Sequence, residues 1–280
     1  MLSWQVGLVK ITRIVEMDLP VPLALMPQAT IAELRKSAWL YPHFVGEDGT
    51  LKLTVHALLV ETPGLRLVVD TCVGNDRPRG ITGGKPLATP FLQHLGEVGW
   101  SRDGVDAVVC THLHSDHVGW NTMLENGKWV PTFPRARYFI TRREYEFWSA
   151  YDDEEQQATL DDSVAPIFDA GLVQLVELDH VISPEIRLTP STGHTPGHVS
   201  VMIESEGERA VIIGDMSHHP CQLAHPDWVF GDDDPEAAVL TRSRLFAEWA
   251  DQRVLLIGTH YPDPTAGYVV RDGDAFALVV

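Results

Sequence analysis

Three short apolar runs in this sequence end in histidine or aspartate, and this pattern limits the fold more than any other feature. DAVVC runs directly into THLHSDH at 111–117, VIIG runs into Asp215, and VLLIGT runs into His260. Short apolar runs of this kind are typical of strands buried in a sheet. Ligands gather at the carboxyl ends of strands in α/β proteins, so the pattern indicates an α/β fold with a functional site.

The order of the remaining elements agrees with this class. Asp234-Pro235 predicts a helix that runs to about residue 251, with Asp as N-cap and Pro at the first helical position. Pro63-Gly64 and Asp272-Gly273 predict hairpin turns. Helical segments are expected at 29–40, 90–98 and 142–170. Strands are expected at 5–15, 53–69, 106–110, 136–141, 173–178, 185–190, 199–204, 209–213 and 254–258. Along the chain, strands are followed by helices and then by strands and helices again. This order suggests two sheets flanked by helices.

The chain has 280 residues, enough for one large domain or two small ones. No linker divides it, so we expect a single domain, 1–280. Residues 19–46 carry several apolar side chains that suit a lid over the site or a contact in a homodimer. An alternative of at least equal weight is that they cover the core. These side chains are Leu23, Leu25, Met26, Trp39, Tyr41 and Phe44.

The formal net charge of −18 argues against nucleic acid or an anionic membrane surface as a partner. The first 18 residues contain no uninterrupted apolar stretch of the kind found in secretory signals, and no run of about 18 apolar residues occurs anywhere. Three cysteines are an odd number for a disulfide scaffold and fit a reducing compartment. We therefore expect a cytoplasmic protein without a membrane span.

The segment THLHSDHVGW (111–120) concentrates metal-binding side chains in one turn. His112 and His114 are two positions apart, so their imidazoles project to the same side of an extended segment. Asp116 and His117 follow on the turn into an expected helix. Imidazole and carboxylate together suit zinc and similar cations. The alternative, an ordinary polar loop, does not explain so many titratable side chains directly after a buried strand.

Further ligands are needed to complete two coordination spheres, and three residues are available. His194 lies in the turn TPSTGHTPGHVS between two expected strands, and Asp215 and His260 follow apolar strands. Each residue alone is more often a cap or a hydrogen-bonded core group. Together with the first cluster they predict a metal site.

The motif HxHxDH, followed by a His, an Asp and a final His, resembles the metallo-β-lactamase superfamily. The likeness runs from Asp70 of VVDTC to the last hairpin, 268–280. It implies an αβ/βα four-layer sandwich, in which two mixed β-sheets are flanked by helices, with two divalent metal ions, most often Zn²⁺. Carried over, the first ion would be held by His112, His114 and His194, the second by Asp116, His117 and His260, and both by Asp215.

Other residues receive roles from the same resemblance. Asp70 matches a position that supports a ligand, although a turn-forming Asp is an equal alternative. His198 is expected to be structural. His218, three positions after Asp215, occupies a place where the superfamily's lactonases carry a tyrosine and methyl parathion hydrolase carries a histidine. It either lines the site or is a solvated loop histidine. Cys72, Cys110 and Cys221 are expected to be small core or loop residues.

The resemblance implies hydrolysis by a hydroxide that bridges the two metals, with Asp116 passing a proton to the leaving group and His218 stabilising the developing charge. The expected substrate is a small lactone or ester, with phosphotriesters as a further class. RNA is disfavoured by the acidic charge, and β-lactams are weaker candidates. Two alternatives stay open, an iron-loaded oxidoreductase and a non-catalytic small-molecule binder. The chain ends at 280 without the flavin domain of the flavodiiron branch, and every ligand position is filled, so we favour the hydrolase.

Overall fold

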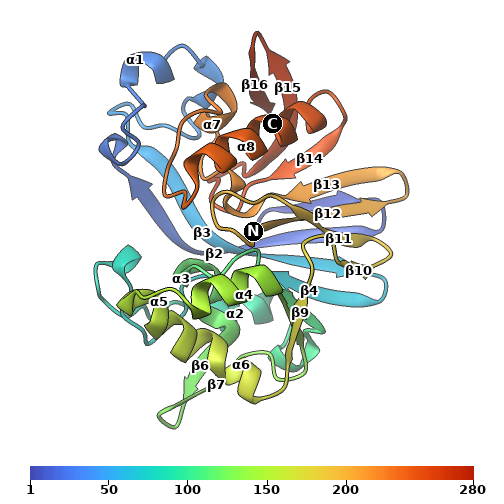
Figure 1. Ribbon diagram of the computed structural model, residues 1–280. Helices are drawn as coiled ribbons and strands as arrows, with labels where there is room; N and C mark the ends of the chain where they lie inside the picture. The colour runs from blue at the N-terminus through green and yellow to red at the C-terminus, as the bar shows by residue number, and fades with distance from the viewer. The chain divides into compact units, whose positions relative to one another are not determined.

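A computed structural model describes all residues from 1 to 280 (Figure 1). The chain forms two compact units. The first comprises 1–17 and 55–177, and the second comprises 18–54 and 178–280.

The first unit contains most of a mixed seven-stranded sheet with the order β1-β2-β3-β4-β5-β8-β9. Residues 18–21 of β2 and 51–54 of β3 belong to the second unit. The central strands β4, β5 and β8 run parallel, so their carboxyl ends meet at one edge. They are apolar and buried along most of their length, as expected for strands covered on both faces. The strands of the sheet are Ser3–Val6 (β1), Val9–Val21 (β2), Leu51–Thr62 (β3), Leu65–Val69 (β4), Ala107–Val109 (β5), Arg137–Thr141 (β8) and Val173–Val176 (β9).

The helices of this unit cluster around α4, which packs against β8 and β9 (Figure 1). Thr141 caps α4, because its hydroxyl accepts a hydrogen bond from the Glu144 backbone amide at 3.3 Å. A π-helical turn, Leu160–Val164, connects α5 to α6. The helices are Phe91–Glu97 (α2), Ser115–Val118 (α3), Arg142–Ser149 (α4), Glu154–Thr159 (α5) and Ala165–Asp169 (α6).

The second unit contains another mixed seven-stranded sheet, with the order β10-β11-β12-β13-β14-β15-β16. Here only β13 and β14 are parallel, and Asp215 and His260 follow their carboxyl ends. The strands are Val181–Ser183 (β10), Ile186–Pro190 (β11), Val199–Ser205 (β12), Glu208–Ile212 (β13), Val254–Ile257 (β14), Ala266–Asp272 (β15) and Ala275–Val279 (β16). Its helices are Ile31–Leu34 (α1), Cys221–Ala224 (α7) and Pro235–Trp249 (α8).

Helix α8 confirms the prediction from Asp234-Pro235. The Asp234 carboxylate accepts from the Ala237 backbone amide at 3.0 Å, and Pro235 is the first helical residue. The helix packs against β15 and α7 packs against β16. The expected hairpins at Pro63-Gly64 and Asp272-Gly273 also form, between β3 and β4 and between β15 and β16.

Two expectations for the elements need correction, and one element was not expected. The strand expected at 5–15 is a hairpin of β1 and β2, because Gly7 takes a left-handed φ of 54°. The helix expected at 29–40 shrinks to α1 and a separate 3-10 turn, Ala38–Leu40. A two-stranded sheet, Thr122–Glu125 (β6) with Lys128–Pro131 (β7), was not expected, although Asn126-Gly127 is a strong hairpin signal.

Most apolar side chains of residues 19–46 pack inside the second unit. Met26 and Phe44 are buried in its core, and Leu23, Trp39 and Tyr41 pack against that core. Only Leu25, at 58 % exposure, stands out as a large exposed apolar side chain among those six. This packing agrees with the core-covering alternative. A lid or dimer contact stays a prediction, as does the single domain.

Candidate metal centre

The loop after β5 carries four expected ligands of the first unit and is tied to the segment after β4. Thr71 donates its amide to the His117 carbonyl at 2.7 Å, and Gly119 donates to the Cys72 carbonyl at 2.7 Å. Gly119 has no room for a side chain, since a Cβ there would lie 1.8 Å from the Val73 carbonyl oxygen. The ligand loop therefore rests on backbone from the neighbouring parallel strand.

His112 and His114 point two ring nitrogens at each other. His112 Nε2 lies 3.0 Å from His114 Nδ1. Two nitrogen ligands on a tetrahedral zinc ion are separated by about 3.3 Å, given bonds of about 2.05 Å. The two rings thus lie side by side, as expected, at close to the spacing that a shared cation requires.

Asp70 supports the ligands of this loop rather than forming a simple turn. Its Oδ2 accepts from His117 Nδ1 at 2.9 Å and from the Thr111 hydroxyl at 2.8 Å, while Oδ1 accepts from the Thr111 amide at 2.8 Å. The Thr111 oxygen lies 3.1 Å from His112 Nδ1, so it is placed to accept that N–H. Both imidazoles are then held with Nδ1 protonated and Nε2 bare, the form that binds a metal.

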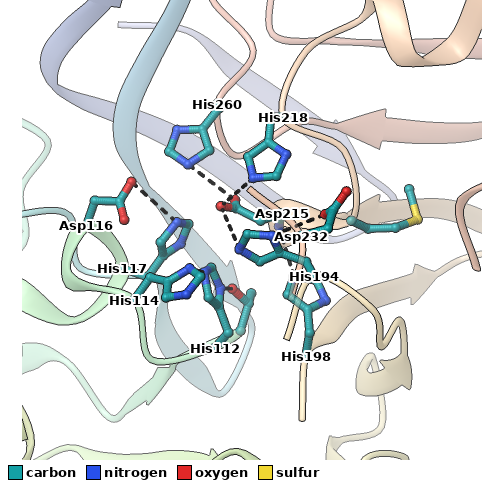
Figure 2. Close-up of polar contacts among 12 residues, drawn as sticks. His112, His114, Asp116, His117, His194, His198, Asp215, His218, Asp232 and His260 are labelled. Carbon is teal, nitrogen blue, oxygen red and sulfur yellow. Dashed lines mark hydrogen bonds and ion pairs between the residues drawn. The ribbon is translucent and has the colours of Figure 1, made fainter. Parts of the chain in front are cut away.

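Asp116 lies in the first turn of α3 beside His117. Its Oδ2 is 3.7 Å from His117 Nε2, and its side chain is 14 % exposed (Figure 2). A carboxylate and a bare imidazole nitrogen that face each other suit a cation between them. The partial exposure leaves Asp116 accessible to a small molecule.

Two helices hold the loop from behind through the peptide of Leu113. The buried Glu144 of α4 accepts from the Leu113 amide at 3.1 Å and from Trp148 Nε1 at 2.6 Å. Gln156 of α5 donates to the Leu113 carbonyl at 3.0 Å. Since Leu113 lies between His112 and His114, these contacts fix both ligands. Neither Glu144 nor Gln156 was predicted to belong to the site.

In the second unit, Asp215 lies at the centre of three histidines, and its two oxygens face different ones (Figure 2). Oδ1 is 3.2 Å from His260 Nε2, whereas Oδ2 is 3.5 Å from His194 Nε2 and 3.3 Å from His218 Nε2. All four side chains are at least 93 % buried. The expected ligands of this unit therefore converge on one carboxylate.

The outer nitrogens of two of these histidines are already engaged. His260 Nδ1 donates to the Thr54 carbonyl at 3.0 Å, and His194 Nδ1 donates to Asp232 Oδ1 at 3.3 Å. Each Nε2 is then a bare lone pair that faces a carboxylate oxygen. Such a contact is repulsive unless a proton or a cation lies between the atoms. The donor set therefore fits a metal ion.

Asp232 was missed by the sequence analysis, because the run GDDDP resembles a solvated loop. His194, His218 and Asp232 also form a group close enough to hold a cation. Asp232 is better placed as a support for His194, since its second oxygen accepts from Arg242 at 3.2 Å. Burial raises the pKa of Asp232, but the hydrogen bond from His194 and the neighbouring positive charges outweigh it and lower the pKa overall.

His218 is not a solvated loop histidine. The residue is only 5 % exposed. Its ring lies edge-on to the ring of Phe230, with the two ring centroids 5.1 Å apart. The Gln222 side chain accepts from the His218 amide at 2.8 Å and holds this turn. The alternative in which His218 lines the site is the one that agrees with this geometry.

His198 and His219 are structural. His198 Nε2 accepts from the Asp215 amide at 2.8 Å and Nδ1 lies 3.0 Å from the Ser191 carbonyl oxygen. His219 donates from Nε2 to the Phe44 carbonyl at 2.8 Å, and burial lowers its pKa to about 4. The three cysteines are buried and free, as expected, and burial raises the pKa of Cys110 to about 12.

Comparison with known proteins decides the family. The profile of the Metallo-beta-lactamase superfamily matches residues 51–260. The chain belongs to this superfamily. The predicted fold class, two mixed sheets flanked by helices in the metallo-β-lactamase fold, is confirmed.

Several superfamily members resemble the chain over most of its length. The N-acyl homoserine lactonase AiiA of Bacillus thuringiensis subsp. kurstaki is 26% identical over 210 residues, 70% of this chain and 76% of the relative. The solved structure of hydrolase AbOPH is 25% identical in sequence and has a TM-score of 0.81. The match covers 99% of this chain and 96% of the AbOPH chain. AidC, a dizinc quorum-quenching lactonase, has a TM-score of 0.80 at 22% identity over 99% of this chain and 96% of its own. The enzyme prediction is confirmed at this level: the chain is a metallo-β-lactamase-superfamily hydrolase with lactonase relatives.

The remaining expectations are tested only in part. None of the helices combines the length and the apolar character that a membrane crossing requires. The small-molecule substrate agrees with the lactonase relatives. The cytoplasmic location, the lack of nucleic-acid binding and the homodimer stay predictions.

Proposed function

We propose that this superfamily member is a dinuclear zinc hydrolase that opens lactones or cleaves related esters. In this proposal the first ion is held by His112, His114 and His194, the second by Asp116, His117 and His260, and both by Asp215. The assignment joins one group of ligands from each unit, and superfamily membership supports joining them.

The observation that carries the proposal is the division of the Asp215 carboxylate. One oxygen faces His260 and the other faces His194, at 3.2 and 3.5 Å between the carboxylate oxygen and Nε2. Oxygen and nitrogen ligands on one zinc ion are separated by about 3.3 Å when the bonds are near 2.0–2.1 Å. A carboxylate whose oxygens serve different histidines has the geometry of a bridging ligand.

A pair of zinc ions would supply hydroxide at neutral pH and would polarise the substrate's carbonyl. Asp116, partly exposed beside His117, is placed to hold a proton and to deliver it to the leaving alkoxide. His218, buried against Phe230, can donate a hydrogen bond to the carbonyl oxygen as charge develops there. Burial strengthens this interaction, because water screens it less.

A small substrate agrees with the surface next to these residues. A hollow of about 270 Å³ in the first unit is lined by side chains that include Asp116, His114, Trp148 and Tyr151. Three carboxylates, those of Asp116, Asp153 and Glu155, line it too, which favours neutral over anionic substrates. Relatives named N-acyl homoserine lactonase support the lactone as the first substrate class to test.

The test combines metal content with turnover. Chelator-treated protein is titrated with Zn²⁺, and bound metal and hydrolysis of an N-acyl homoserine lactone, an aryl ester and a phosphotriester are measured. We expect two ions per chain, and lactone or ester turnover that is lost on chelation and restored by zinc. Asp215→Asn should lose both properties, whereas the control Asp227→Asn, exposed in the same unit, should keep them. Fewer than two ions, or no turnover of any substrate, contradicts the proposal. Two irons and no zinc in natively purified protein would favour the oxidoreductase.

A further inference from the structure

One buried arginine connects the loop that carries Asp215 to Asp232, the residue that supports His194. Arg242 of α8 is 0 % exposed. Its Nε donates to the Met216 carbonyl at 2.9 Å, and Met216 directly follows Asp215. Its Nη2 donates to Asp232 Oδ2 at 3.2 Å.

The same guanidinium anchors the chain between these two points. Its Nη1 donates to the carbonyls of Pro226 and Trp228, each at 2.9 Å. The planar fork of Arg242 therefore gathers three segments around one side chain. Lysine cannot do this, because its ammonium is a point charge without the fixed spread of five donors.

The turn of His194 is pressed onto the same helix. Asp232 accepts from His194 Nδ1 at 3.3 Å, and the Asp233 amide donates to the His194 carbonyl at 3.0 Å. Gly193 lies so close to α8 that a Cβ would be 2.3 Å from the Ala238 amide nitrogen. His194 is thus fixed in place by α8 and by the loop that Arg242 holds.

These contacts close a ring of residues. From Asp215 it passes through Met216 to Arg242, then to Asp232 and His194, whose Nε2 returns to the Asp215 carboxylate at 3.5 Å. A buried ion pair contributes little net stability, since desolvation offsets the attraction, and apolar side chains of similar volume often serve as well. The ion pair of Arg242 and Asp232 lies behind two proposed ligands, which indicates a role other than stability.

We propose that Arg242 is a positioning residue that sets the distance and orientation of His194 relative to Asp215. The inference rests on the proposed function, because it assigns these two residues as metal ligands. The hydrogen bonds of Arg242 go to Asp232 and to backbone carbonyls behind the proposed ligands. Arg242 acts through Asp232 on one side and through the Met216 carbonyl on the other.

The test measures metal affinity on chelator-treated protein, independently of turnover. Arg242→Lys keeps the charge and loses the fork, and Asp232→Asn keeps the shape and loses the charge. We expect each variant to bind one of the two zinc ions about 10–100-fold more weakly, as is usual when the support of a ligand is lost. The electronic spectrum of the Co²⁺-substituted protein should change in both. The double variant should be no worse than the more affected single variant, because both changes break one network.

The matched control is Arg244→Lys, on the same helix but 58 % exposed in an ion pair with Glu248. It should leave the zinc affinity and the Co²⁺ spectrum unchanged.

Zinc affinities for Arg242→Lys within twofold of wild type, or additive effects in the double variant, overturn the inference. A fall in thermal stability with both ions bound as in wild type also overturns it, because that is a structural role. If Arg242→Lys does not fold, Asp232→Asn alone decides. A wild-type chain that binds no zinc overturns the proposed function itself, so the two failures are distinguishable.

Discussion

Asp70 Oδ2 lies 2.9 Å from His117 Nδ1, and the same oxygen accepts the Thr111 hydroxyl at 2.8 Å. One carboxylate therefore directs His117 through a direct contact and His112 through Thr111. Asp70 adopts a φ of 55°, in the left-handed region that few side chains other than Asn and Asp tolerate. The backbone conformation and the hydrogen bonds together explain why an aspartate follows β4.

Replacing Asp70 by asparagine should separate its charge from its conformation. Asparagine keeps the left-handed backbone but binds the imidazole N–H less strongly, so His117 should lose its fixed orientation. We expect zinc affinity at one site to fall about 10–100-fold, measured by competition with a chelator. Asp76→Asn is the matched control, since Asp76 is exposed and has a φ of 66°. Two ions bound with wild-type affinity in Asp70→Asn would show that this support is dispensable.

Asp116→Asn should remove most activity and leave the fold intact. The side chain is 14 % exposed, so its replacement disturbs little packing. Loss of the proton-transferring carboxylate should lower kcat by about 100-fold or more. The rate is compared with that of Asp103→Asn, in the 3-10 turn Arg102–Gly104, which should match wild type. Unchanged turnover in Asp116→Asn would contradict its assigned role.

The adjacent histidines 218 and 219 should respond differently to alanine. His218→Ala removes a ring beside Asp215 and should lower kcat about 10–1,000-fold while two zinc ions remain bound. His219→Ala breaks hydrogen bonds to the Phe44 carbonyl and the Cys221 amide, so it should lower the free energy of unfolding by about 1–3 kcal/mol. Steady-state kinetics, metal analysis and denaturant unfolding distinguish the two effects. A normal kcat in His218→Ala would remove it from the site.

His219 should also make the metal-free protein sensitive to acid. Burial lowers its pKa from 6.5 to about 4, so between these values the folded state binds fewer protons than the unfolded state. The stability from the neutral ring is present above pH 6.5 and is lost as the pH falls toward 4. His219→Gln can replace both hydrogen bonds and does not titrate. From pH 7 to pH 5, the free energy of unfolding should fall by about 2 kcal/mol more in wild type than in this variant. Parallel pH profiles would contradict the prediction.

The sequence predicted the fold class and the candidate ligands because both depend on local patterns. Apolar runs mark the strands, and His and Asp side chains at their carboxyl ends mark the edge where ligands gather. The hairpin of β6 and β7 was also readable, since Asn126-Gly127 favours a two-residue turn, and it was overlooked. Residues 29–40 have a helical pattern, but α1 ends at Leu34 and a 3-10 turn follows at Ala38–Leu40.

Apart from Asp70, the supporting residues could not be predicted, because their roles arise only when distant segments dock. Glu144 and Asp232 look like surface acids in the sequence. In the structure, Glu144 accepts from the Leu113 amide between two candidate ligands, and Asp232 accepts from the candidate ligand His194. Nothing in the sequence distinguishes Arg242 from an ordinary surface arginine on a helix. His218 was ambiguous for the same reason, since only the folded turn shows that its ring faces Asp215.

The contact between Gly119 and the Val73 carbonyl has a consequence for laboratory evolution of this enzyme. A methyl group at position 119 would overlap backbone that has no freedom to retreat, because the neighbouring amides are already paired. Libraries that randomise 115–122 should therefore recover only glycine at this codon, whereas half-buried Ser115, next to the hollow, is open to diversification.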